Sequence, residues 1–591
     1  MNDICLLGVL QLLRLMRFLK PYWFAALLAP LFMLLEVAMD LLQPRLMASI
    51  VDGGIMAKDL DHVLRTGGVM LGVALVGLVG GACCTIYSTI ASQHFGTDLR
   101  QELFHKIQSL SIQSIDRVGT GSLITRLTSD IAQIQQIVLM VLRVFARNSF
   151  QIIGSVVMVM LISPRLAVII LFMIPLLVLT LVVTTRMTIP LFSKVQEKLD
   201  GVNTVMAENL SGIRVIKAFV RADYEEKRFG GTNGGLLRAS LKAARIAALN
   251  TPLMSIIVNF SIVGALWYGG VLTREGSLPV GDLAAFLTYI TQLLMSIVGL
   301  GNQLMLVSRG KASADRLNEI MEMPDDKPDA LTATAAAAVH SSRYAIQAGR
   351  LEFQGVSFSY DGDPEHAVLR DISFTAEPGE TIGIVGVNGA GKSTLVSLIP
   401  RFYEPSEGEI RLDSRNISEI DPEELHSQVG MVLQQAMLFS GTIRDNISYG
   451  KPDATDAEIE AAARAAQAHE FIAKLPDGYD TVVGQRGVNL SGGQKQRLSI
   501  ARTLLMKPKL VILDDCTSAV DLTTDRRIRQ SLDRVMKDST CLIIGQRIAS
   551  VEHADRILVI EDGRITAEGT HKELLERSRL YNQIALSQQG A

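Results

Sequence analysis

Six long apolar stretches lie in this chain, all before residue 310. A helix of ~20 mostly apolar residues is long enough to cross the hydrocarbon core of a bilayer. Inside that core every backbone polar group needs a partner within the protein, and a helix supplies one to each. We therefore predict six membrane-spanning helices, at about Trp23–Leu42, Gly67–Ala91, Val138–Ser163, Leu166–Thr185, Thr251–Leu272 and Leu283–Val307.

The charges between these stretches predict how the chain is oriented. The two long connections, Ser92–Ile137 and Arg186–Ile246, are rich in Lys and Arg, and the second holds eleven of them. By the positive-inside rule, both termini and both long connections lie in the cytoplasm. Neither connection contains a further spanning stretch, so we expect helices that extend beyond the membrane. Arg143 and Arg147 interrupt the third stretch, and we place them near its cytoplasmic end or below the lipid.

Composition narrows the classes of function. Hydrophobic residues make up 48% of the 591 residues, which fits a membrane part joined to a soluble part. The net charge of -3 does not suggest a nucleic-acid partner. The five cysteines are odd in number and lack metal-ligand spacing, so we expect neither a disulfide framework nor a zinc site. The first apolar stretch has no convincing cleavage site, which argues against a cleaved signal peptide.

The character of the sequence changes after the sixth stretch. Residues Pro324–Arg343 combine Pro, Asp and small residues without apolar periodicity, so we interpret them as a linker. Beyond them, strand-like runs such as "RLEFQGVSFSY" and "TIGIVG" alternate with helical patterns such as "STLVSLIPRFY", which predicts an α/β domain. The expected division is a membrane domain over residues 1–323, a linker over 324–349 and a second domain over 350–591.

A phosphate-binding pattern opens the second domain. The segment "GVNGAGKST", Gly386–Thr394, matches G-x-x-x-x-G-K-[ST], follows a predicted strand at Thr381–Val385 and opens a predicted helix. Glycines of this loop let backbone N–H groups turn inward around phosphate oxygens. Lys392 would reach the β- and γ-phosphates, and Ser393 would bind Mg²⁺. The alternative is a Gly-rich turn without a ligand, which the flanking strand and helix disfavour.

A second acidic motif completes this pattern. In "LVILDDCTSAVD" a buried strand, Leu510–Leu513, runs into two adjacent aspartates. Asp514 is placed to hold Mg²⁺, often through water, although two solvated aspartates at a strand end are the alternative. Cys516, next to them, is either a redox switch or a small packed residue, and the second interpretation is favoured.

The segment "LSGGQKQR", Leu490–Arg497, resembles the signature of ATP-binding-cassette (ABC) ATPases and precedes the Asp514 strand as it does in that family. Further family positions are an aromatic platform for adenine, a Q-loop glutamine and a D-loop, which match Tyr360, Gln434 and Ser518–Asp521. The likeness extends into the first half, because "GTGSLITRLTSD" and "AENLSGIRVIKAF" are typical of ABC exporters. Six helices followed by one cassette resemble a half-transporter.

The resemblance implies a multi-domain fold, with an all-α six-helix transmembrane domain followed by an α/β P-loop ABC ATPase domain. ATP and Mg²⁺ would be its cofactors. The implied nucleotide contacts are Tyr360, Gly386, Asn388, Gly389, Gly391, Lys392, Ser393, Thr394, Gln434, Ser491, Gly492, Gly493 and Gln494, and the implied metal contacts are Ser393, Gln434 and Asp514.

In such proteins two cassettes close head to tail, and each ATP lies between the phosphate loop of one chain and the signature of the other. A dimer is therefore implied. Short helices at the tips of the long connections, near Ser109–Arg117 and Gly212–Arg221, would rest on the cassettes. The alternative is that these tips are solvated charged helices.

Two positions depart from the family's hydrolytic set. Asp515 stands where the family usually has the Glu that polarises the attacking water, and its side chain is one methylene shorter. A displacement of ~1 Å can cost on the order of 10²-fold in rate. Gln546 stands where the family usually has a His, and Gln carries no positive charge at neutral pH. We interpret the site built on this chain's phosphate loop as one that binds MgATP but hydrolyses it slowly.

The signature is intact, so it would complete a competent site whose Glu and His come from a different partner chain. This resembles heterodimeric ABC exporters. The alternatives are a homodimer in which Asp515 works as a weak base, and a channel or regulator that ATP gates without pumping. A soluble ABC ATPase is a third class, and the six apolar stretches argue against it.

The substrate is not specified by the motifs. A hydrophobic, drug-like or lipid small molecule, exported across the cytoplasmic membrane, is what the resemblance implies. Glu36 and Asp40 lie four residues apart in the first stretch, hence on one helical face. They could face a cavity and favour cationic substrates, because ionisable groups inside a membrane are costly and usually functional. Alternatively, Asp40 lies in the outer interface and Glu36 pairs within the helix bundle.

Overall fold

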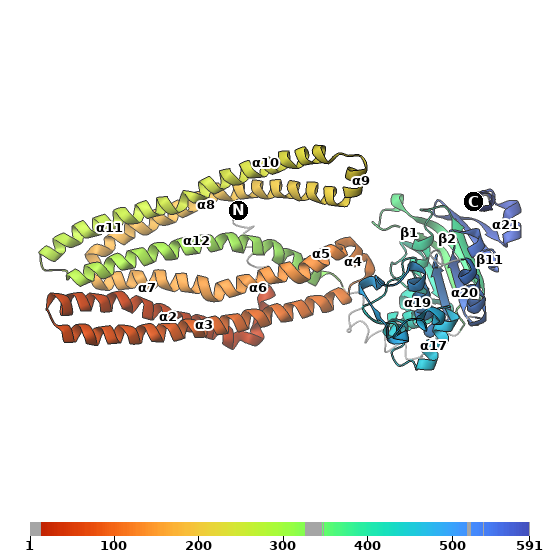
Figure 1. Ribbon diagram of the computed structural model, residues 1–591, viewed down its shortest axis with the longest axis horizontal. Coiled ribbons are helices and arrows are strands. Elements are labelled where there is room, and N and C mark those ends of the chain that lie inside the picture. The colour runs from red at the N-terminus through yellow and green to blue at the C-terminus, as the bar shows by residue number, and fades with distance from the viewer. Residues whose placement is uncertain (1–13, 325–345, 347, 517–521, 536, 590–591) are drawn as a thin grey trace. The chain divides into compact units, whose positions relative to one another are not determined.

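The computed structural model describes residues 14–324, 346, 348–516, 522–535 and 537–589. It separates into two compact units (Figure 1). The first unit comprises Met1–Ser109 with Val118–Pro324, and the second comprises Leu110–Arg117 with Asp325–Ala591. The predicted fold class, a helical membrane domain followed by an α/β cassette, is confirmed.

Long helices form the first unit and the tips of its connections. Their bounds are η1 Met16–Tyr22, α2 Trp23–Ser49, η2 Ile50–Met56, α3 Leu60–Gln108, α4 Ile112–Val118, α5 Thr120–Thr125, η3 Arg126–Asp130, α6 Ile131–Met140, η4 Val141–Phe145, α7 Ala146–Ile162, α8 Pro164–Ser211, α9 Ile213–Ala218, α10 Ala222–Ala248, α11 Asn250–Arg274 and α12 Val280–Glu322. Within the described residues, six helical runs are long and apolar enough to cross a membrane. The helices α3 and α8 continue far past their apolar parts, as expected.

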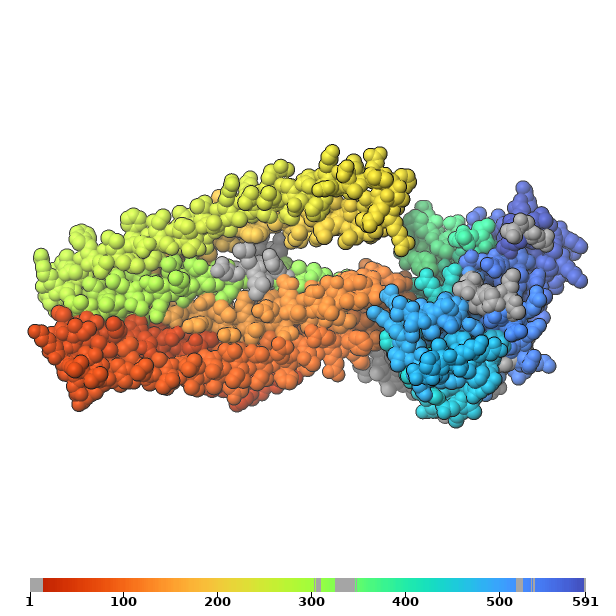
Figure 2. Space-filling view, viewed as in Figure 1, coloured from red at the N-terminus to blue at the C-terminus, as the bar shows by residue number. Residues whose placement is uncertain are grey.

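The core of this unit lies where α2, α7, α8, α11 and α12 meet. Phe286 and Tyr289 of α12 are fully buried there. The Tyr289 hydroxyl donates a 2.6 Å hydrogen bond to the carbonyl of Leu41, so the buried phenol has the polar partner that burial requires. Away from this core, α8 and α10 pack on each other as an arm that diverges from the other helices of the unit (Figures 1 and 2).

Among its described residues, the cassette contains three sheets and three hydrophobic core clusters. Its strands are β1 Leu351–Phe358, β2 Leu369–Ala376, β3 Thr381–Gly386, β4 Glu407–Leu412, β5 Arg415–Asn416, β6 Val429–Val432, β7 Gly441–Thr442, β8 Val482–Val483, β9 Leu510–Asp514, β10 Thr540–Ile544, β11 Arg556–Glu561 and β12 Arg564–Gly569. Its helices are α14 Lys392–Leu398, α15 Pro422–Gln428, α16 Ile443–Ile447, α17 Asp456–Ala465, α18 His469–Ile472, α19 Gly492–Leu505, α20 Leu522–Val535, α21 His571–Arg577 and α22 Arg579–Gln589.

The six-stranded sheet has the order β12-β11-β3-β10-β9-β6. All neighbours are parallel except β12, which is antiparallel to β11. Ile544 at the end of β10 pairs with Ile384 of β3 on one side and with Asp514 of β9 on the other. The three segments that follow β3, β10 and β9 therefore meet at one edge of the sheet, which is where ligands bind in parallel sheets.

Candidate nucleotide site

The loop after β3 has a shape that only glycine allows. Gly391 is the N-cap of α14 and has φ = 98°, a conformation that side chains strongly disfavour. A Cβ at Gly391 would lie 2.8 Å from Leu369 Cδ2, and one at Gly386 would lie 2.2 Å from the carbonyl oxygen of Ile560. The G-x-x-x-x-G spacing is therefore required by the packing of the loop as well as by any bound phosphate.

Lys392 is held inside this loop. Its Nζ donates hydrogen bonds of 2.8 Å to the carbonyl of Gly386 and 2.9 Å to that of Val387. Burial lowers the pKa of Lys392, against the opposing attraction of Asp514 and Asp515. The ammonium group is thus positioned at the loop before any ligand arrives, which is the arrangement that phosphate recognition needs.

The two aspartates at the end of β9, Asp514 as its last residue and Asp515 directly after it, are both buried. Burial raises the pKa of Asp514, while a hydrogen bond from Ser393 and the charge of Lys392 oppose the rise. Burial, followed by repulsion from Asp514, also raises the pKa of Asp515, and Gln434, Arg547 and Lys392 oppose it. Two buried carboxylates side by side favour a bound cation, because a cation relieves both the burial cost and their repulsion.

One cavity joins these groups. It has a volume of about 360 Å³ and is lined by Val368, Asn388, Gly389, Gly391, Lys392, Ser393, Thr394, Gln434, Asp514, Asp515, Ile544 and Gln546. Ser393 and Asp514 supply the oxygen donors that Mg²⁺ prefers. Among the described residues no cluster of three His, Cys, Asp or Glu side chains exists. The donor set therefore fits a Mg²⁺ that is shared with nucleotide phosphates rather than caged by protein ligands.

Asp515 has a constrained backbone. Its φ is 43°, which is uncommon for a residue with a side chain. Its N–H donates a 3.1 Å hydrogen bond to the carbonyl of Ile544. Gln434 Nε2 lies 3.5 Å from Asp515 Oδ2. The carboxylate therefore cannot advance into the cavity by a simple shift of its backbone.

Tyr360 lies beside the loop rather than in the cavity lining. Its hydroxyl is 3.0 Å from Thr394 Oγ1, and its ring stands edge-on to Phe358 and Tyr403, with ring centroids 4.9 and 5.2 Å away. The ring is half exposed, so one surface is available for stacking on a base.

The predicted signature residues are not brought to this cavity. Ser491 is the N-cap of α19, and its hydroxyl accepts a hydrogen bond from the Gln494 N–H while Gln494 accepts one from the Ser491 N–H. This capping box fixes the start of α19. Ser491 and Gly492 are exposed. The predicted D-loop, Ser518–Asp521, lies outside the described residues.

Sequence patterns did not indicate Gln588. Its side chain bridges the segment after β10: Nε2 donates to the Gln546 carbonyl and Oε1 accepts from the Ile548 N–H, both at 2.8 Å. Gln588 lies in α22, far along the chain, and no motif marks it. Cys516 is buried, and burial raises the pKa of its thiol, which disfavours a reactive thiolate there.

Known proteins match this chain over nearly its whole length. Residues 26–297 match the family described as "ABC transporter transmembrane region", and residues 369–518 match "ABC transporter". An uncharacterised ABC transporter ATP-binding protein of Bacillus subtilis (strain 168), YfiB, is 43% identical over 573 residues, which are 97% of this chain and 98% of that protein. The chain belongs to the ABC transporter family.

More distant ABC transporters match as well. An ATP-dependent lipid A-core flippase of Syntrophus aciditrophicus (strain SB) is 34% identical, covering 87% of this chain and 84% of its own length. The solved structure of a bacterial Atm1-family ABC exporter with ATP bound aligns with a TM-score of 0.77 at 27% identity, covering 98% of this chain and 99% of that one. The protein is therefore a multi-pass membrane protein with a cytoplasmic ATPase domain that is coupled to transport.

Proposed function

We propose that this chain is one subunit of a heterodimeric exporter of hydrophobic or lipid-like molecules across the cytoplasmic membrane, and that its own nucleotide site holds MgATP but hydrolyses it slowly. The observation that carries the second part is that Asp515 and Gln546 line the same cavity as the phosphate loop. Export is supported by the Atm1-family exporter and a lipid-like substrate by the lipid A-core flippases, both of which match along most of this chain.

Binding of MgATP rests on groups that are already in place. Lys392 and the loop N–H groups would hold the phosphates, Ser393 and Asp514 the Mg²⁺, with Gln434 beside it, and Tyr360 the base. When bound, Mg²⁺ would neutralise phosphate charge. The protein contributes position, because the loop and the aspartates are fixed by the sheet edge.

Slow hydrolysis follows from the reach of Asp515. Its backbone is fixed by the Ile544 hydrogen bond, so the missing methylene of a Glu is not compensated by a backbone shift. A base that stops ~1 Å short of the water's position loses on the order of 10²-fold in rate. Gln546 is exposed at the cavity, and it could donate a hydrogen bond to a phosphate but could not contribute positive charge.

Dimer formation is supported by groups that this chain leaves uncovered. The signature Ser491 does not line the cavity of its own chain, so a second chain would supply one to this site and receive this one. On the α8–α10 arm, only Ala243 is buried among the described residues of α10. At its tip, Phe219 and Val220 are 73% and 86% exposed. Apolar side chains this exposed in the cytoplasm indicate a partner surface.

Contacts within the second unit support a route between the first long connection and the nucleotide site. Tyr403 donates a hydrogen bond to Asp116 of α4, at the tip of the first long connection. The ring of Tyr403 packs on Tyr360, whose hydroxyl contacts Thr394 of the phosphate loop. We propose that movement of α4 reaches the nucleotide through this chain of contacts. We also propose that the membrane domain spans residues 1–323, the linker 324–349 and the ATPase domain 350–591.

The proposed division of labour is tested by asymmetry between the two sites. The transporter is purified with its partner, and ATP turnover is measured for Asp515→Ala in this chain and for the Glu→Ala change at the matching position of the partner. We expect Asp515→Ala to lower turnover less than twofold and the partner change to abolish it. Lys392→Ala is the matched control, because it removes nucleotide binding at the same site. Complete loss of turnover with Asp515→Ala would overturn the proposal.

A further inference from the structure

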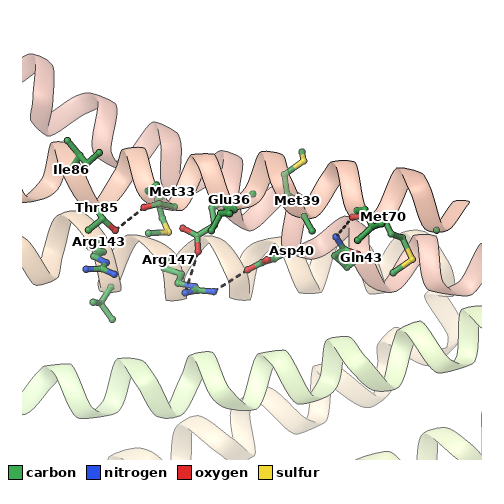
Figure 3. Close-up of a pocket in the computed structure, with 18 residues that line it drawn as sticks. Met33, Glu36, Met39, Asp40, Gln43, Met70, Thr85, Ile86, Arg143 and Arg147 are labelled. Carbon is green, nitrogen blue, oxygen red and sulfur yellow. Dashed lines mark hydrogen bonds and ion pairs between the residues drawn. The ribbon is translucent and has the colours of Figure 1, made fainter.

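A cavity in the first unit lies between α2, α3, η4 and the start of α7, and it is lined by charged side chains as well as apolar ones. Its volume is about 1190 Å³. Figure 3 shows the side chains that line it spread along the helices, and we name it the α2–α3 groove. Its α3 side includes Gly77 and Gly81, near the middle of the apolar stretch Gly67–Ala91. The groove therefore lies at membrane depth.

Three of its charges form a cluster. Arg147 Nη2 lies 3.1 Å from Asp40 Oδ2, and Arg147 Nη1 lies 3.5 Å from Glu36 Oε1. Gly81 makes room for the cluster, because a Cβ there would lie 2.8 Å from Glu36 Oε2. The sequence suggested either that Glu36 and Asp40 face a cavity or that Glu36 pairs within the helix bundle. The structure combines the two, because both acids line the cavity and Glu36 also pairs with Arg147. One guanidinium between two carboxylates leaves one negative charge.

Arg143 carries the fourth charge. It lies one helical turn from Arg147, on η4, and lines the same groove. Among the described residues Arg143 has no hydrogen bond or ion pair, and Figure 3 shows none joining it to its neighbours. We expected both arginines near the cytoplasmic end of the third span or below the lipid. The structure instead places Arg147 beside Glu36 and Asp40, near the middle of α2.

The groove thus has two electrical poles. The single negative charge is shared between Glu36 and Asp40, around Arg147, and the unpaired positive charge of Arg143 lies about one turn, ~6 Å, toward the cytoplasmic side of Arg147. An unpaired guanidinium at membrane depth is costly unless an anion or water neutralises it. π-helical turns such as η4 are frequent at functional sites. The apolar part of the lining includes Met33, Met39 and Met70, side chains that adapt to varied shapes.

We propose that the α2–α3 groove binds an amphiphile from the bilayer whose headgroup carries an anionic group and an ammonium group about one helical turn apart. The anionic group contacts Arg143, the ammonium group contacts Asp40 and Glu36, and the hydrocarbon part lies along the methionines and α3. An uncharged hydrophobic ligand would leave both charges of the groove without a partner. A purely cationic ligand would leave Arg143 unpaired. The site does not depend on how fast the nucleotide site hydrolyses ATP.

The test is a comparison of headgroups on one hydrocarbon tail. The transporter, purified with its partner in detergent and without nucleotide, is titrated into phosphatidylethanolamine, phosphatidylglycerol and a trimethylammonium lipid, each with the same fluorescent acyl chain, and anisotropy gives Kd. We expect the zwitterionic lipid to bind about 10-fold more tightly than the other two. Equal affinities for all three, or no saturable binding because the partner covers the groove, would overturn the proposal.

Variants assign each pole separately. Arg143→Gln should weaken binding of the zwitterionic and anionic lipids about 10-fold and spare the cationic one, whereas Asp40→Asn should weaken the zwitterionic and cationic lipids and spare the anionic one. Arg143→Lys keeps the charge and should retain most binding, which separates lost charge from a lost fold. Arg65→Gln is the matched control, since Arg65 is 80% exposed and pairs with Asp61 outside the groove. Unchanged headgroup preference in both Arg143→Gln and Asp40→Asn would contradict the assignment of the two headgroup charges to these residues.

Discussion

Restoring the usual residues at the two departing positions should convert this chain's slow nucleotide site into a fast one. Asp515→Glu adds the methylene that brings a carboxylate ~1 Å farther into a cavity of about 360 Å³. Gln546→His adds a side chain that can carry positive charge, at a position whose carbonyl is already fixed by Gln588. Neither change requires the sheet edge to move, because both side chains face the cavity that the phosphate loop lines.

The expected gain follows from the displacement. A 1 Å misplacement costs on the order of 10²-fold, which corresponds to ~2.7 kcal/mol of activation free energy at ~1.36 kcal/mol per tenfold. We therefore expect Asp515→Glu with Gln546→His to hydrolyse ATP roughly 10²-fold faster at this site than the unmodified chain does. Most of the gain should come from the carboxylate, since the base acts directly on the water.

The assay isolates the site by silencing the other one. The catalytic Glu of the partner is replaced by Gln, and single-turnover hydrolysis of radiolabelled ATP is followed after rapid mixing. Adding Lys392→Ala to the double variant should remove the gain, which shows that it arises at this phosphate loop. If the unmodified site already hydrolyses as fast as the double variant, the degenerate-site reasoning is refuted.

Four further changes test other parts of the structure. Gly391→Ala forces a side chain into φ = 98° and should cost ~1–3 kcal/mol, which should reduce the MgATP-induced rise in Tm of the purified transporter by the share that this site contributes. Arg147→Ala leaves Glu36, whose side chain is 17% exposed, without its counter-charge. The free energy of unfolding should fall by up to ~3 kcal/mol, which lowers Tm. Adding Glu36→Gln should recover part of this loss. Tyr403→Phe removes the hydrogen bond to α4 and should reduce substrate stimulation of ATP turnover while MgATP affinity stays within twofold. Gln588→Ala removes both hydrogen bonds to the segment after β10 and should raise hydrogen exchange there by roughly tenfold, as expected for the loss of ~1–2 kcal/mol.

The parts of this protein that the sequence predicts are those set by local pattern. Six spans follow from apolar length alone, and the structure has them. The phosphate loop follows from glycine spacing between a strand and a helix, because Gly386 and Gly391 occupy positions with no room for a Cβ. The tips predicted as short helices are α4 and α9. In each case the cause acts within a few residues, so the sequence displays it.

The parts that the sequence does not predict depend on pairs far apart in the chain. Arg147 lies beside Asp40 because α2 and α7 pack together, and no spacing in either helix indicates the other. This pairing is also why an arginine is tolerated at a depth where we did not expect one. Gln588 reaches the segment after β10 only through the fold of α22. The φ of Asp515 is likewise invisible in the motif that contains it.

The central claim is that this chain supplies a signature to a partner with a complete hydrolytic site and holds a slow site of its own. The most direct measurement is affinity purification of this chain from native membranes, followed by identification of the bound proteins. We expect a second ABC half-transporter in equal amount, with Glu at the position matching Asp515 and His at the position matching Gln546. Recovery of this chain alone as a homodimer with robust ATP turnover would contradict it.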